Sequence, residues 1–215
     1  MPDEAVRARL QDGLNALPFA VSGEQAEQML AYLALLNRWN AVHNLTAVRD
    51  PLLQVSVHVL DSLSVLPFIG EDCRTLADVG SGAGLPALML AMMRPAMQVY
   101  AVEASRKKCA FIRQAAISLQ LGNVEVINRR VEDWQPQVAV DVIVSRAMAS
   151  LPLLLRLTRH LGNAHSRFLV FKGPEAEDDQ VPGFMIEAPQ VVEVPLLAAQ
   201  RFVYCARKRA ENEEC

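Results

Sequence analysis

Apolar residues in the first third of the chain recur at the spacing of amphipathic helices. Ser22 and Gln25 have the spacing of a capping box, and an apolar stripe with a period of 3.6 follows them. A polar loop around Asp50-Pro51 comes next, and a second helix is predicted over 54–66, ending before Pro67. We therefore expect residues 1–67 to form a helical extension. The stripe consists of Ala26, Met29, Leu30, Leu33, Leu36 and Asn40.

From Thr75 onward, short apolar runs alternate with helical stretches. Such alternation indicates βαβ units around a parallel sheet. We predict the α/β class, with a doubly wound, mostly parallel, seven-stranded sheet of the Rossmann-like type in a domain covering residues 68–206. Helices are predicted over Leu85–Met93, Ser105–Gln120 and Leu151–Leu161. Strands are predicted over Thr75–Val79, Gln98–Glu103, Val124–Asn128, Val138–Ser145, Arg167–Lys172, Val191–Val194 and Arg201–Ala206.

The last part of the chain is less regular. Gly173–Pro189 is rich in proline, glycine and acidic residues and is predicted to be a loop with little regular structure. The last pair of predicted strands should form a closing hairpin. Residues 207–215 are predicted to be a charged tail.

Composition limits the class of protein. The chain has 215 residues, of which 52% are hydrophobic and 21% charged, which is typical of a folded domain with an appendage and excludes disorder. The longest apolar run, Leu85–Met93, is well short of the roughly 18 residues of a membrane span. The N-terminus lacks the pattern of a signal peptide. We expect a cytoplasmic protein, most simply a monomer, with no membrane partner.

Charge and cysteine usage narrow the partners. The net charge is −3, from 21 basic and 24 acidic residues, so nucleic acid would have to be held by a local basic patch. The cysteines are scattered without C-x-x-C spacing, so we predict no metal site.

The strongest chemical signal is the glycine-rich segment 78–86, between a predicted strand and a predicted helix. Glycines allow a tight turn and the close approach of a ligand, and Pro86 is expected in the first helical turn. Ligands of open α/β sheets bind beyond the carboxyl ends of the strands, so Gly80, Ser81, Gly82, Gly84 and Leu85 are predicted to bind a ligand.

The spacing of this loop limits the type of ligand. G-x-G-x-G differs from the G-x-G-x-x-G of dinucleotide binders, and there is no Walker phosphate motif. Glu103 follows the second predicted strand, where a carboxylate can accept both hydroxyls of a ribose. A ribose is common to NAD and S-adenosylmethionine, so both ligands agree with this feature.

Together these motifs resemble one family. Asp78–Pro86 with Glu103 looks like motifs I and II of class I S-adenosylmethionine-dependent methyltransferases. A wider set of segments resembles the methyltransferase G family of small-subunit ribosomal RNA, also called glucose-inhibited division protein B; Ala87 departs from that family's usual second glycine. The set comprises residues 36–40, Asn44-Leu45-Thr46-Ala47, 49–51, His58, 61–63, 82–86, Lys107-Lys108, Ser145-Arg146-Ala147 and Lys172-Gly173.

The resemblance implies methylation of guanine N7 at one position of 16S rRNA, with S-adenosylmethionine as the donor. The substrate would be 16S rRNA or the small ribosomal subunit. By the same resemblance, the cofactor contacts fall on Gly80, Leu85, the pair Val131-Glu132 and Arg146, and Glu103 takes the ribose.

The residues themselves support parts of this interpretation. The loop 131–133 follows the third predicted strand and borders the expected adenine site, although a solvated loop is equally compatible with the sequence. Arg146, at the end of a buried strand, is costly to place without a partner and is predicted to hold a carboxylate, a phosphate or the target base. A structural ion pair is the alternative. Since guanine N7 already carries a lone pair, Arg146 is expected to position substrate rather than act as an acid or base.

Several basic residues are candidates for RNA binding. Arg106, Lys107 and Lys108 occupy the first turn of a predicted helix, where positive charge opposes the helix dipole, and an RNA phosphate would relieve that conflict. A solvent-screened patch is equally compatible with the sequence. Arg129-Arg130 with Lys172 and Arg201 would extend a basic rim.

His58 and Asp61 lie three positions apart on a predicted helix and so should share a face. A hydrogen-bonded structural pair or a cap over the cofactor is the favoured interpretation, and an acid–base pair is the alternative. Trp39 is interpreted as a core anchor rather than as a platform on which a base stacks.

Two other functions remain open. One is a methyltransferase for a small molecule or a protein, since fold does not fix substrate and the net charge is acidic. The other is a non-catalytic nucleotide-binding module.

Overall fold

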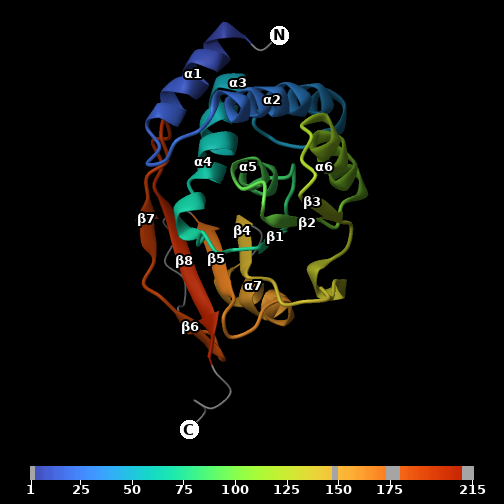
Figure 1. The fold of residues 1–215 in the computed structure, drawn as a ribbon, viewed down its shortest axis with the longest axis vertical. Coiled ribbons are helices and arrows are strands. Elements are labelled where there is room, and N and C mark those ends of the chain that lie inside the picture. Colours follow the sequence, from blue (N-terminus) through green and yellow to red (C-terminus); the bar gives the residue numbers. More distant parts are fainter. Residues whose placement is uncertain (1–2, 147–149, 173–179, 210–215) are drawn as a thin grey trace.

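The N-terminal part of the chain is helical, as predicted (Figure 1). The computed structural model describes residues 3–146, 150–172 and 180–209. The predicted capping box of Ser22 and Gln25 is present, and α2 ends at Asn44, which has a left-handed φ of 49°. The second predicted helix is three consecutive segments, of which the middle one is a π-helix. The helical elements of the N-terminal part are α1 (Glu4–Asn15), α2 (Gly23–His43), α3 (Pro51–Gln54), the π-helix Val55–Leu60, α4 (Asp61–Leu63) and a 3-10 turn (Leu66–Phe68).

One mostly parallel sheet forms the centre of the molecule and confirms the predicted α/β class. Its strand order is β3-β2-β1-β4-β5-β8-β6, with β7 also paired to β8. The first part of the sheet is parallel, and β8 runs antiparallel to β5, β6 and β7. The strands are β1 (Thr75–Val79), β2 (Gln98–Val102), β3 (Val124–Ile127), β4 (Val142–Arg146), β5 (Arg167–Lys172), β6 (Phe184–Ile186), β7 (Gln190–Val192) and β8 (Arg201–Lys208).

The strand order indicates which end of the sheet carries the functional site. The chain steps from β1 outward to β2 and β3, and then returns to β4 on the other side of β1. Such a reversal opens a crevice at the carboxyl ends of the two strands that flank it. The functional site is therefore expected beyond the carboxyl ends of β1 and β4.

Three sequence predictions about strands were wrong. The sheet has 8 strands rather than seven, because β6 lies in the segment predicted as an irregular loop. Phe184 is buried edge-to-face on Phe168, so β6 forms by tertiary contact with the sheet rather than by a local pattern. β4 begins at Val142, because Val138 is 64% exposed, and β8 continues through Lys208 into the predicted tail.

The predicted hairpin of β7 and β8 is confirmed. Residues 173–179 of the predicted loop and 210–215 of the predicted tail lie outside the described residues.

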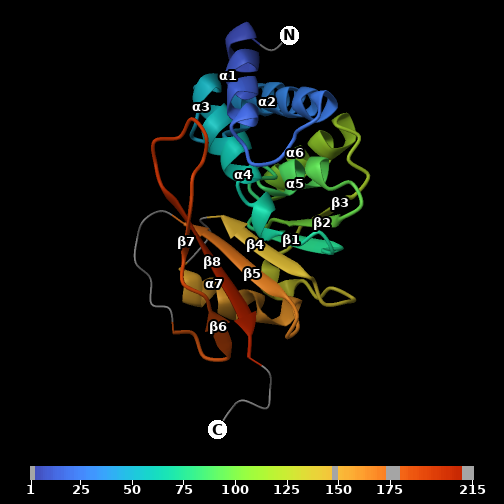
Figure 2. The same ribbon diagram turned by 60° about the vertical axis from the view of Figure 1, so that its left-hand side comes forward.

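Helices cover both faces of the sheet (Figures 1 and 2). α5 (Ala87–Met93), α6 (Arg106–Ser118) and the N-terminal helices pack on one face, and α7 (Leu151–Thr158) packs on the other. Alternate residues of the strands point to opposite faces, so Val142 and Val144 join the first apolar cluster and Ile143 joins the second. The N-terminal helices thus share one core with α5 and α6.

One helical segment has the length and hydropathy that a membrane span requires. It covers Pro51–Phe68, with a mean hydropathy of 1.3, and 67% of it is buried inside the structure. It includes Val55 and Val59, which are fully buried in the first apolar cluster. This is the pattern of a core helix in a folded domain.

The connection between β7 and β8 reaches back to the N-terminal helices (Figure 2). Arg9 on α1 donates hydrogen bonds to the backbone carbonyls of Leu52 at 2.9 Å and Leu196 at 3.4 Å. The β7–β8 connection is therefore tied to the N-terminal helices through Arg9.

Candidate functional site

The glycine loop after β1 has a backbone that only glycine adopts readily. Gly80, Gly82 and Gly84 have φ angles of 75°, 59° and 80°. Pro86 is the N-cap residue of α5 and precedes the helix, which corrects its predicted place in the first helical turn. The preceding Leu85–Pro86 peptide bond is cis. The loop turns back within a few residues and brings its amides to the end of the sheet.

A buried carboxylate stabilises this turn from below. Asp78 is fully buried, and its Oδ2 accepts hydrogen bonds from the Ser81 hydroxyl and from the Ala87 N–H, the latter at 3.1 Å. Its Oδ1 has no partner among the described residues. Burial raises the pKa of Asp78 to about 6, because the charged form loses its hydration.

Glu103 links the end of β2 to the glycine loop. Its Oε2 accepts from the Gly82 N–H and its Oε1 from the Ser105 N–H, both at 2.9 Å. Each carboxylate oxygen has a further lone pair, so these bonds leave acceptor capacity for a ligand hydroxyl. The predicted ribose-binding residue is therefore also the residue that orients the loop.

A cavity of about 440 Å³ opens at the carboxyl ends of β1, β2 and β4. It contains several of the predicted cofactor residues: Gly80, Glu103, Val131, Glu132 and Arg146. Ser81, Gly82, Gly84 and Leu85 are not among the residues that line it, and Ser81 and Leu85 are buried beneath the loop. The remaining lining residues are Val79, Val102, Ala104, Lys108, Arg129, Arg130 and Leu157.

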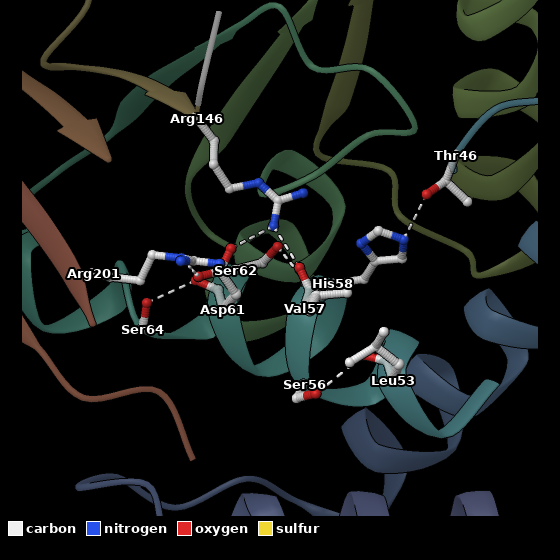
Figure 3. Close-up of polar contacts among 10 residues, drawn as sticks. All are labelled: Thr46, Leu53, Ser56, Val57, His58, Asp61, Ser62, Ser64, Arg146 and Arg201. Carbon is white, nitrogen blue, oxygen red and sulfur yellow. Dashed lines mark hydrogen bonds and ion pairs between the residues drawn. The ribbon is translucent and has the colours of Figure 1, made fainter. Parts of the chain in front are cut away.

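Arg146 is held by a buried carboxylate (Figure 3). Its Nη1 donates to Asp61 Oδ2 at 2.7 Å and to the Val57 carbonyl at 2.9 Å. The other oxygen, Asp61 Oδ1, accepts from Arg201 Nε at 2.9 Å. We call Asp61, Arg146 and Arg201 the arginine clasp. Arg146 therefore has the structural ion pair that was the alternative interpretation, and it also lines the cavity. That it holds a ligand group stays a prediction.

The predicted pairing of His58 with Asp61 is wrong (Figure 3). His58 Nε2 is hydrogen-bonded to the Thr46 hydroxyl at 3.0 Å, and its Nδ1 is buried without a partner among the described residues. The segment is a π-helix through Leu60, so residues three apart no longer lie above one another as they do in an α-helix. Burial and the nearby charge of Arg146 lower the pKa of His58 to about 4, so the ring is neutral at pH 7.

The N-terminal extension supports the glycine loop directly, which the sequence analysis missed. The hydroxyl of Tyr32 on α2 donates to the Ala83 carbonyl at 2.8 Å, and Tyr32 is fully buried. Burial raises the pKa of this phenol well above its usual value. A buried tyrosine on the apolar face of a helix was the available signal, because its hydroxyl needs a partner.

The predicted RNA-binding residues divide into two groups. Lys108 and Arg130 line the cavity, together with Arg129. Arg106 and Lys107 are exposed at the start of α6, whereas Arg201 is half-buried in the arginine clasp and Lys172 is half-buried at the end of β5. The basic groups at the cavity mouth therefore come from α6 and from the segment after β3. Ala147 and Gly173, which belong to the motifs cited above, lie outside the described residues.

Within residues 3–146, 150–172 and 180–209, no group of three or more His, Cys, Asp or Glu side chains is arranged to hold a metal ion.

The strand order, the glycine loop after β1 and the acid after β2 define the fold of S-adenosylmethionine-dependent methyltransferases. Solved structures agree at the level of the fold. A SAM-dependent methyltransferase from Aquifex aeolicus superimposes with a TM-score of 0.55, at 20% identity, covering 72% of this chain and 92% of that one. TrmN from Thermus thermophilus gives a TM-score of 0.53 at 20% identity, covering 70% and 48%.

Sequence comparison identifies the family within this class. Residues 25–194 match the family model of rRNA small subunit methyltransferase G. Ribosomal RNA small subunit methyltransferase G of Dichelobacter nodosus is 43% identical over 98% of this chain and 100% of its own length. The protein of the same name from Stutzerimonas stutzeri is 43% identical over 95% and 97%. The chain belongs to the rRNA small subunit methyltransferase G family.

Proposed function

We propose that this protein transfers the methyl group of S-adenosylmethionine to N7 of a guanine in 16S ribosomal RNA. The observation that carries the proposal is the cavity beyond β1 and β4, in which the cofactor residues and basic side chains meet. Full-length similarity to relatives named for this class of substrate supports it. We further propose that the protein acts as a monomer in the cytoplasm, on 16S rRNA or on the small subunit, without a metal ion.

The residues present fit the cofactor. Glu103 keeps free lone pairs at the cavity wall, and Gly80 presents backbone with no side chain in the way. Val131 and Glu132 form a 3-10 turn that closes the side of the cavity where an adenine would lie. Arg146 offers a cation for the carboxylate of the methionine part. Bound there, S-adenosylmethionine would supply a methyl group that is already activated by its sulfonium.

Methyl transfer to guanine N7 requires little acid–base catalysis from the protein. Guanine N7 carries a lone pair in the ring plane and needs no base to become a nucleophile. The protein therefore has to align the two reactants and exclude other groups, and such positioning is worth several kcal/mol. The buried states of Asp78 and His58 agree with this, because neither lines the cavity.

Arg146 is proposed as a positioning residue at the boundary between cofactor and RNA. The clasp fixes Nη1 and so fixes the plane of the guanidinium. Lys108, Arg129 and Arg130, which also line the cavity, would meet the phosphates around the target base.

The proposal is tested by transfer of a labelled methyl group from S-adenosylmethionine. Small subunits, protein-free 16S rRNA, total protein and a metabolite pool are offered separately, all from cells that lack this gene. Label in rRNA, released as 7-methylguanine on hydrolysis, is the expected result. Label in protein or metabolites alone would contradict the substrate and favour a different methyltransferase. Cofactor binding without any transfer would indicate a nucleotide-binding module.

A further inference from the structure

A second surface, outside the cofactor cavity, has the chemistry of a nucleic-acid contact. It lies where the C-terminal half of α2 packs beside α6, and it contains a hollow of about 460 Å³. Its α2 side is formed by Leu35, Arg38, Trp39, Val42 and His43. Its α6 side is formed by Gln114 and Ser118.

The distribution of charge sets this surface apart. The segments 28–49 and 104–124 contain no Asp or Glu, although the chain has 24 of them and a net charge of −3. The same segments carry Arg38 and His43 on α2 and the basic first turn of α6. Arg38 and Lys107 are exposed and have no ion pair among the described residues. The two segments that form this surface therefore carry no negatively charged side chain, which favours a polyanion there.

The floor of the hollow is aromatic. The rings of Trp39 and His43 lie 5.2 Å apart between centroids, and Trp39 also packs edge-to-face on Phe111 at 5.6 Å. Trp39 is only half-buried and lines the hollow. Beside it Val42 is 75% exposed, and on α6 Ile117 is 74% exposed. Flat rings and apolar side chains next to cations are what an unstacked base and its phosphates require.

The surface continues into the cofactor cavity through α6. Lys108 lines the cavity, Lys107 is its exposed neighbour, and Gln114 and Ser118 reach the hollow. α6 has 13 residues and is therefore about 20 Å long, at 1.5 Å per residue. One strand with its target base in the cavity can thus follow α6 to the hollow.

We propose that the α2–α6 surface, centred on Arg38, Trp39 and His43, binds a single-stranded segment of the substrate RNA that flanks the target nucleotide. A base lies on the Trp39–His43 rings and its phosphates meet Arg38 and Lys107. This inference rests on the proposed function for the identity of the RNA, and it deepens it by assigning a second contact.

The first experiment measures Trp39 directly. The chain has 2 tryptophans, and Trp134 lies outside both cavities, buried against Tyr100. Trp134→Phe keeps that aromatic contact and leaves Trp39 as the sole tryptophan. We expect a short oligouridylate to quench its fluorescence, and added salt to reverse the quenching. Unchanged fluorescence at saturating RNA would overturn the stacking role.

The second experiment compares two exposed arginines. Arg38→Glu should weaken binding to protein-free 16S rRNA by about tenfold and reduce the slope of log K against log salt by about 0.7 for each lost phosphate contact. Arg74→Glu is the matched control, because Arg74 is exposed at the amino-terminal edge of the sheet. Affinity for S-adenosylmethionine should be unchanged in both variants.

The outcomes separate this proposal from the proposed function. Equal losses in Arg38→Glu and Arg74→Glu would overturn it, since only net charge would then matter. A loss with assembled subunits but not with protein-free rRNA would also overturn it, in favour of a ribosomal protein on this surface. Failure of the wild type to methylate rRNA would contradict the proposed function. The RNA-binding and fluorescence-quenching experiments would still decide whether the α2–α6 surface binds RNA.

Discussion

Two buried carboxylates next to the candidate site, Asp78 and Asp61, are stabilised in different ways. Asp78 beneath the glycine loop accepts from a hydroxyl and an amide of its own segment, and one of its oxygens has no partner among the described residues. Asp61 in the arginine clasp binds cations from β4 and β8. The first carboxylate shapes a local turn, whereas the second joins distant parts of the chain. The structural role of a buried acid near a site therefore depends on its hydrogen-bond and ion-pair partners rather than on its burial.

The largest expected effect is at the clasp. Asp61→Ala removes the shared partner of Arg146 and Arg201 and leaves two cations near buried surface. We expect the free energy of unfolding to fall by about 3 kcal/mol. Urea denaturation followed by circular dichroism measures this. Asp61→Asn keeps the shape and should lose less, and an unchanged midpoint in the alanine variant would show that the clasp adds no stability.

The next largest effect is expected from alanine substitutions in the glycine loop. A Cβ at Gly84 would lie 2.6 Å from a Leu88 methyl group, whereas at Gly82 the nearest atom is the Gly80 carbonyl oxygen at 3.9 Å. Both positions have positive φ, so both alanine variants are strained. Gly84→Ala should therefore lower stability by about 1–3 kcal/mol more than Gly82→Ala. Thermal unfolding of the pair checks this, and equal losses would mean that Leu88 moves aside freely.

The raised pKa of Asp78 predicts a pH dependence of opposite sign to that of most acids. Because its folded pKa of about 6 exceeds the ordinary value of 3.8, the stability linked to this group is full below pH 4 and lost as the pH rises through 6. Asp78→Asn should remove this dependence and unfold no more easily than the wild type at pH 8, where the penalty is of the order of 1–3 kcal/mol. Unfolding free energies across pH 4–8 for both proteins provide the measurement. Parallel profiles would contradict the assignment.

The smallest effect concerns the support of the loop from the N-terminal extension. Tyr32→Phe removes the donor to the Ala83 carbonyl and should cost about 1 kcal/mol. Calorimetric titration with S-adenosylmethionine should show weaker binding, since the loop loses its anchor. Tyr100→Phe is the control, because Tyr100 packs on Trp134 and its hydroxyl has no hydrogen bond among the described residues. Equal affinities in the two variants would show that α2 does not support the loop.

The two regions also differ in how far the sequence predicted them. The glycine loop, Asp78 and Glu103 were predictable because their partners are near in sequence or follow from the rule for parallel strands. The clasp was not, since Arg146 and Arg201 lie 85 and 140 positions from Asp61. A periodic pattern of residues does not indicate contacts between positions so far apart in the sequence.

Errors in the fold have the same origin. The pairing of His58 with Asp61 assumed α-helical spacing, which the π-helix changes. β6 exists because an edge of the sheet was available to it, and its own residues carry no strand pattern. Helix caps and alternating segments, which depend on neighbours, were predicted correctly.

The position of Arg201 has a consequence for how the protein is made. Synthesis runs from the N-terminus, so Asp61 leaves the ribosome well before Arg201 does. Until β8 joins the sheet, Asp61 lacks the cation of Arg201 and is paired with Arg146 alone. A nascent chain can thus form the glycine loop early, but the arginine clasp is completed only when the last strand is added.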